Sequence, residues 1–300
     1  MNLGIWLAIL SGALYGTLGL FGVYLPQEGF CITNFLFWRF SFAVVLLLPF
    51  LNTLDHWRGV ISKSGLIITM VSGIFYATAT SCYFLSIEYI GSGLAMVLFF
   101  CYPIFVVLLD WLHGKNPPSK LTLSGLLVVM IGTLFLSDPN QWNLSLHGIL
   151  WGLLCAFGFG IYFYTSQRAI KGIPVISGTF CICLGNSLIF AFLVLLSGTL
   201  KLPTTFSAFC NISAFAVVST LLPIYFVFVA LRYIDGTKAS VLSVFEPIVT
   251  IILGVVFLNE KITLVQYLGV GIVLVGVYIV QSCKKQTVKA NGEPLFKKTA

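Results

Sequence analysis

The stretch RYIDGTKASVLSVFEPIV, from Arg232 to Val249, decides the fold because a second copy of it occurs earlier in the chain. The earlier copy, EYIGSGLAMVLFFCYPIF, begins at Glu88 and aligns without a gap at an offset of 144 residues. Both copies carry a Tyr-Ile pair near the start and a Pro-Ile pair near the end. The same offset also places Gly16 on Gly160. A fixed offset with matched glycines and prolines indicates an internal duplication rather than convergence of apolar sequence.

The composition places the chain in a membrane. It has 300 residues, of which 59% are hydrophobic and only 8% are charged, and its mean hydropathy is +1.04. The apolar runs are continuous over about 20 residues, as membrane-spanning helices require, whereas barrel strands would be shorter and alternating. We expect an all-α polytopic membrane protein. The net charge of +7 does not indicate nucleic-acid binding, because the basic residues occupy short loops and the C-terminal tail.

The hydropathy pattern predicts ten transmembrane helices joined by short loops. Since each copy of the duplication then holds five helices, an odd number, the second copy enters the membrane from the opposite side. The sequence thus predicts two inverted five-helix repeats, residues 1–140 and 141–283, followed by a disordered cytoplasmic tail at 284–300. The expected helices are 3–24, 32–51, 64–88, 91–112, 120–137, 146–168, 174–198, 208–233, 236–258 and 262–282.

The distribution of Lys and Arg predicts the orientation. Thirteen of the sixteen fall on one side of the predicted membrane, two fall on the other, and Arg39 lies within a span. Because basic loops stay in the cytoplasm, both termini are expected to be cytoplasmic. The thirteen are Arg58, Lys63, Lys115, Lys120, Arg168, Lys171, Arg232, Lys238, Lys284, Lys285, Lys289, Lys297 and Lys298, against Lys201 and Lys261.

The sequence resembles a known family at three places. LSVFEPIVTIILGVVFLNEKITLVQYLGVGIVLVGVYIV (residues 242–280) has a Glu-Pro helix, a Leu-x-Glu end and a last helix with spaced glycines. The first half repeats this more loosely, and FLFWRFSFAVVLLL (residues 35–48) has the Arg-Phe of the second helix. These features resemble the EamA-type transporters of the drug/metabolite transporter superfamily. One departure is Lys115-Asn116, where the family often has Gly-Glu, while the second half keeps Glu260.

The resemblance implies transport of small metabolites, often amino acids or their derivatives and frequently as efflux. The fold and the resemblance together predict a secondary transporter in a bacterial inner membrane, working by alternating access. The expected partners are a small-molecule solute, membrane lipids, and protons or a counter-solute, with the protein a monomer or a homodimer. No nucleotide-binding loop or catalytic motif is present in the sequence, so we expect neither an enzyme nor a cofactor or metal. The alternatives are a nucleotide- or nucleoside-derivative exchanger and a non-transporting membrane scaffold.

Glu246 is the strongest candidate for solute binding. It lies near the middle of its predicted span, where a charge costs roughly 2.5–3.5 kcal/mol and should face a cavity or a partner. It could bind a solute amine or carry a coupling proton, or serve as a protonated group bonded to a neighbouring helix. The repeat places Tyr102 at the equivalent position. Arg39 could pair with a solute carboxylate or with Glu246, although the resembled family commonly has an arginine here, which favours a structural or gating role.

Further solute-binding candidates are aromatic and depend on facing inward. They are Tyr15, Trp38 and Tyr225, with Tyr83 and Tyr162 as weaker ones. Pro103 and Pro247 are expected to kink their helices at the cavity, because proline removes one helical hydrogen bond.

Overall fold

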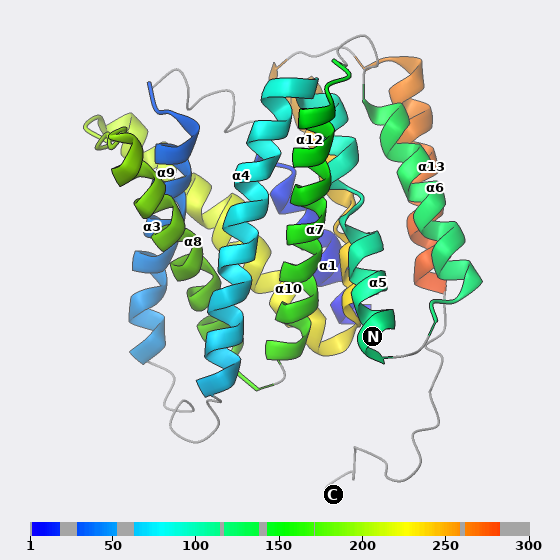
Figure 1. The fold of residues 1–300 in the computed structure, drawn as a ribbon, viewed down its shortest axis with the longest axis horizontal. Coiled ribbons are helices and arrows are strands. Elements are labelled where there is room, and N and C mark those ends of the chain that lie inside the picture. The colour runs from blue at the N-terminus through cyan, green and yellow to red at the C-terminus, as the bar shows by residue number, and fades with distance from the viewer. Residues whose placement is uncertain are drawn as a thin grey trace, which may run out of the picture.

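The structure is a computed structural model that describes residues 2–18, 29–52, 63–114, 117–137, 143–170, 172–258 and 262–282. The described residues form a bundle of helices with no strand (Figure 1). The turn at residues 115–116, Glu260 and the tail at 284–300 lie outside the described residues. The helices are α1 (Asn2–Tyr15), α3 (Ile32–Asn52), α4 (Lys63–Phe99), α5 (Tyr102–Gly114), α6 (Lys120–Leu136), α7 (Leu146–Ala169), α8 (Val175–Ser197), α9 (Phe206–Ala216), the π-helix η4 (Val217–Leu221), α10 (Leu222–Tyr233), α11 (Gly236–Leu242), α12 (Phe245–Leu258) and α13 (Leu264–Ser282).

The bundle has two ends, named here as Figure 1 draws them. The lower end carries the start of α1, the end of α10 and the end of α13. The upper end carries the starts of α3 and α7 and the place where α4 turns back. That turn lies at Gly91, whose φ of 78° and ψ of 161° interrupt the helix. Because only glycine adopts such a conformation at low cost, Gly91 lets one helix cross upward and the next begin downward without a loop.

Seven described helical stretches are long and apolar enough to cross a membrane, and three shorter apolar helices accompany them. The chain is therefore a multi-pass membrane protein. The count of ten spans stays a prediction, because α1, α5 and α6 are shorter than a full crossing. The expected helix 64–88 is the first part of α4, and the expected helix 91–112 is divided between the rest of α4 and α5.

Two of the expected spans are discontinuous. The chain leaves helical geometry at residues 100–101, between α4 and α5, and again at residues 243–244, between α11 and α12. Each break comes just before a proline, Pro103 or Pro247, which lacks the N–H that would continue the helical ladder. In the second break the carbonyl of Ser243 is the group that Pro247 leaves without its usual donor. Gly12 of α1 packs against it, because a Cβ added to Gly12 would lie only 2.6 Å from that oxygen.

Glycines bring the two halves together in equivalent ways. A Cβ added to Gly4 would lie 2.6 Å from the Cβ of Tyr233, so α1 packs closely on the end of α10. A Cβ added to Gly148 would lie 2.7 Å from the Cβ of Tyr89, so α7 packs equally closely on α4. These residues correspond at the offset of 144, yet the first contact involves the start of α1 at the lower end and the second the start of α7 at the upper end.

Helices α6 and α13 lie together at one edge of the bundle (Figure 1). Their contact is a double glycine crossing, in which a Cβ added to Gly125 would lie 3.1 Å from the carbonyl oxygen of Gly276, and one added to Gly132 would lie 3.2 Å from that of Gly269. Small residues at both positions let two membrane helices approach until their backbones touch.

Candidate solute-binding site

A cavity of about 480 Å³ lies between the two halves of the chain. Its walls come from both sequence repeats, with residues of α1, α3, α4, α7 and α12 among them. Most of its lining is apolar, and rings dominate. The aromatic residues that line it are Tyr15, Phe30, Phe35, Tyr76, Tyr83, Phe84, Phe99, Phe100, Phe159 and Phe215.

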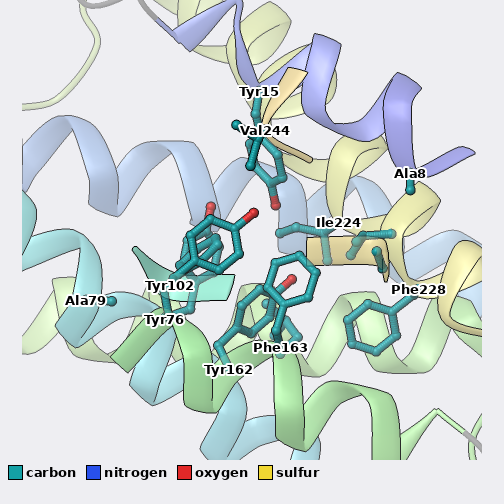
Figure 2. Close-up of a cluster of buried hydrophobic side chains, with 14 of the residues drawn as sticks. Ala8, Tyr15, Tyr76, Ala79, Tyr102, Tyr162, Phe163, Ile224, Phe228 and Val244 are labelled. Atoms are coloured by element: carbon teal, nitrogen blue, oxygen red, sulfur yellow. The ribbon is translucent and has the colours of Figure 1, made fainter. Parts of the chain in front are cut away.

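The cavity extends from the middle of the bundle toward the upper end. Its lining includes Ile32, at the start of α3, and Ser92, beside the turn in α4, and both are exposed. At its deeper part it includes Arg39 and Glu246. Below these residues the aromatic side chains close up. Figure 2 shows the rings of Tyr15, Tyr76, Tyr102 and Tyr162 gathered where α1, α4, α5 and α7 meet.

Glu246 stands in the first turn of α12, directly after the break in that span. The break and Pro247 hold the side chain at the cavity wall, and both residues line it. No described residue forms a hydrogen bond or ion pair with the Glu246 carboxyl group. The positive charge of Arg39 acts on it through space without a direct contact. A carboxyl group inside a membrane protein with no protein partner is available to a ligand or a proton.

Arg39 lies close to the cavity but is held by the protein. It is 3% exposed. Its Nε donates to the Thr220 hydroxyl at 2.5 Å, and its Nη2 donates to the Ser219 carbonyl at 2.8 Å. That carbonyl can accept from Arg39 because Pro223, one turn later, has no N–H with which to form the usual helical hydrogen bond. The guanidinium also lies 4.9 Å from the ring centroid of Phe215. These contacts fix Arg39 against η4, the short π-helix between α9 and α10.

Tyr102 lies just beneath the cavity and does not line it. The side chain is 1% exposed, and its hydroxyl donates to the carbonyl of Ser240 at 2.8 Å. Its ring stacks on Phe163, with 5.4 Å between centroids. Pro103, next in the chain, likewise shapes the helix without reaching the lining. The structure therefore separates the two repeat-related positions, with Glu246 in the open cavity and Tyr102 in the closed packing below it.

The other aromatic candidates divide in the same way. Tyr15 and Tyr83 line the cavity. The hydroxyl of Tyr15 is buried, and no described residue bonds it. Trp38 faces elsewhere, since its indole N–H donates to the Lys201 carbonyl at 2.8 Å. Tyr225 is also absent from the lining. The geometry gives no support to solute binding by Trp38 or Tyr225.

Sequence reasoning missed four polar lining residues. Tyr76 and Thr80 lie one turn apart on α4, followed by Tyr83 and Ile87 on the same face. That spacing of four, three and four residues is the signal that could have identified the wall, because it marks one side of a helix. The other two are Thr250, one turn after Glu246, and Ser92, beside the turn in α4. Among the described residues no group of His, Cys, Asp or Glu side chains could hold a metal ion.

Comparison with known proteins identifies the family. The sequence model of the EamA-like transporter family matches residues 2–138 and again residues 146–282. The chain is 27% identical over 298 residues to the uncharacterized inner membrane transporter YicL of Salmonella typhimurium, covering 94% of this chain and 96% of that one. It is 24% identical over 272 residues to an uncharacterized transporter of Archaeoglobus fulgidus, covering 90% and 93%.

A solved crystal structure shares the fold. It superimposes with a TM-score of 0.74 and covers 92% of this chain and 95% of its own, at 18% sequence identity. The two family matches together span nearly the whole of the described chain, and they divide it where the sequence repeat does. The chain is therefore a member of the EamA-like transporter family, with one copy of the family's unit in each half.

Proposed function

We propose that this protein is a secondary transporter that moves a small organic solute across a bacterial inner membrane, with an amino acid or an amino-acid derivative as the solute class. The observation that carries the proposal is the carboxyl group of Glu246 in a cavity between the two halves, with no hydrogen-bond or ion-pair partner among the described residues. A scaffold protein gains nothing from an ionisable group held there, since the group is costly in a membrane. The inner-membrane name of the Salmonella relative supports the location.

Two features of the backbone support alternating access. Discontinuous helices beside a central cavity are typical of secondary transporters, and here both breaks flank the cavity. Equivalent close contacts also occur in the two halves. A Cβ on Gly16 would lie 2.8 Å from the Cβ of Val249, and a Cβ on Gly160 would lie 2.7 Å from the Cβ of Phe105. Two inverted halves with matching contacts can exchange conformations, which would close one end and open the other.

The chemistry of the cavity supports a solute that has an amine and an apolar body. Glu246 would hold the amine, and the aromatic walls would cover the rest of the solute. A nucleotide would need several cations for its phosphates. Among the described lining residues, Arg39 is the only cation, and two of its three nitrogens already donate to the protein. The cavity therefore favours an amine over a phosphate ester.

The proposal is tested by ligand-induced stabilisation followed by transport. The purified protein is heated with a panel of amino acids, polyamines, nucleosides and their conjugates, and a ligand of the folded state at a hundred times its Kd adds about 2.7 kcal/mol. Glu246→Gln should abolish both that stabilisation and uptake into vesicles. Glu88→Gln is the matched control, because Glu88 is an exposed carboxylate at the end of the α4 crossing. Normal transport by Glu246→Gln would remove Glu246 from the mechanism.

A further inference from the structure

One hydrogen bond closes the packing below the cavity. The Tyr102 hydroxyl, at the start of α5, donates to the carbonyl of Ser240 in α11. That carbonyl is available because the backbone has slipped by one residue. In a regular helix it would accept from Val244, but the Val244 N–H bonds the carbonyl of Val241 instead, at 3.2 Å. The bond from Tyr102 to Ser240 therefore depends on the break between α11 and α12.

The duplication supplies a counterpart to this bond on the open side. At the offset of 144, Glu246 corresponds to Tyr102 and Met96 corresponds to Ser240. Both counterparts line the cavity. At Met96 the helix is still regular, because the Phe100 N–H bonds the carbonyl of Met96 at 3.0 Å, and the slip comes one residue later, where the Cys101 N–H bonds the carbonyl of Leu98 at 3.1 Å. The two sides thus differ in whether the backbone frees this carbonyl, at Ser240 or at Met96. They also differ in the side-chain hydrogen bond, which Tyr102 makes below the cavity and Glu246 does not make within it.

We propose that the protonated Glu246 carboxyl group donates a hydrogen bond to the Met96 carbonyl when the upper end closes, taking the part that Tyr102 plays at the lower end. The proposal rests on the alternating-access function above. A tyrosine always has a proton to donate, whereas a carboxyl group donates only in its acid form, and a carboxylate would instead face a carbonyl oxygen with its own negative charge. Closure of the empty upper end therefore requires a proton on Glu246.

This requirement makes the proton a transported partner. The proton comes from the solution through the cavity, binds a carboxyl oxygen of Glu246, and stays bound while the upper end closes. Once the lower end is open, the Glu246 carboxyl group gives the proton to the solution on that side, where a solute amine can take its place. A solute amine at Glu246 would replace the proton, because an ammonium group can donate to both the carboxylate and the Met96 carbonyl. Proton and amine then compete for one residue, so the gradient of one can drive the other.

The surroundings single out Glu246 as the group that changes charge. The titratable side chains that face it across the cavity come from four helices, and one more lies beneath the cavity on a fifth. Near neutral pH the tyrosines and the cysteine are uncharged, and Arg39 stays positive while bound to η4. The lining groups are Tyr15 on α1, Arg39 on α3, Tyr76 and Tyr83 on α4 and Cys155 on α7, and Tyr102 on α5 lies beneath them.

The test measures access to the upper end as the pH changes. Ser92→Cys places a thiol at the exposed mouth of the cavity. Its labelling by a membrane-impermeant maleimide is read by peptide mass spectrometry, so the native cysteines stay in place. Leu144→Cys, at an exposed position outside the lining, corrects for the ionisation of the thiol itself. The corrected rate should fall about fivefold from mildly alkaline to mildly acidic buffer, the shift that one hydrogen bond of ordinary net strength produces.

Three further variants separate the proposed bond from other causes. In Glu246→Gln the side-chain amide carries N–H groups at every pH, so it can donate without first binding a proton. Labelling should therefore be slow at every pH. In Glu246→Leu nothing donates, so labelling should be fast at every pH. Tyr102→Phe loses the lower bond and should label about fivefold more slowly while keeping its pH dependence. Hydrogen exchange of the 87–99 segment gives the same comparison without any added cysteine.

The outcomes distinguish this inference from the function on which it rests. Labelling of the Ser92→Cys protein that does not change with pH, or Glu246→Gln protein that keeps the pH dependence, would overturn the bond to Met96. If Glu246→Gln then still abolished transport, the proposed function would stand without proton-controlled closure. Normal transport by Glu246→Gln would overturn both.

Discussion

Replacing Arg39 with lysine tests whether this arginine holds the fold or the solute. Lysine keeps the positive charge but offers one nitrogen in place of the planar fork. In the structure the Arg39 guanidinium donates from Nε to Thr220 and from Nη2 to Ser219, and the Arg39 side chain is only 3% exposed. Hydrogen bonds to charged groups contribute about 1.5–3 kcal/mol each. Arg39→Lys should therefore lose one bond and about 2 kcal/mol of unfolding free energy, and Arg39→Met should lose both bonds and about 3–6 kcal/mol.

The assay is unfolding in mixed detergent micelles without any solute, so that only the protein's own contacts contribute. Arg168→Lys is the control. Arg168 is exposed and stacks on Tyr164 with its guanidinium 4.4 Å from the ring centroid, and its substitution should change stability by less than about 0.5 kcal/mol. If Arg39→Lys unfolds like the unaltered protein yet no longer binds solute, the structural role is refuted and Arg39 is a solute ligand.

Two substitutions test the helix contacts around the cavity. Gly16→Ala should destabilise the protein by about 1–3 kcal/mol by overpacking, because its Cβ would lie 2.7 Å from a backbone carbonyl of α12. Gly271→Ala, where nothing lies within 4 Å, should instead be neutral or slightly stabilising. Ser11→Ala removes a buried bond of 2.8 Å to a carbonyl of α10 and should cost about 1–2 kcal/mol. Ser124→Ala, at an exposed bond within its own helix, should cost less than about 0.5 kcal/mol in the same unfolding assay.

The sequence predicted the family and the all-helical membrane class because both depend on patterns along the chain. The length of an apolar run is set by the bilayer thickness and does not depend on how the helices pack. The repeat preserves glycines and prolines that backbone geometry requires. The break before Pro247 was predicted for the same reason. The break at residues 100–101 follows the same logic in the first half, and the turn at Gly91 inside α4 falls where the expected helix 64–88 gives way to the expected helix 91–112. Glycine at position 91 carries no signal of its own among 28 glycines.

The lining of the site was predicted less well, because it depends on how each helix is rotated. The charged residues Glu246 and Arg39 could be placed at the cavity from their cost in a membrane, and both line it. The aromatics could not, since a ring on a lipid-facing side is equally acceptable. Trp38 and Tyr15 look alike in sequence, yet only Tyr15 faces the cavity. The hydrogen bonds between Arg39 and η4 were not predicted, since they depend on Pro223 and on a π-helix together.

The glycine crossing of α6 and α13 has a consequence for how the protein is made. The partner surfaces, at Gly125 and Gly132 on one helix and Gly269 and Gly276 on the other, are separated by most of the second half of the chain. Since a chain emerges from the ribosome N-terminus first, α6 enters the bilayer well before its partner is synthesised. Its glycine face must meet lipid, or an insertion factor, until the last helix arrives. Truncation just before α13 should therefore leave α6 exposed and mark the chain for proteolysis, even though the cavity residues are all present.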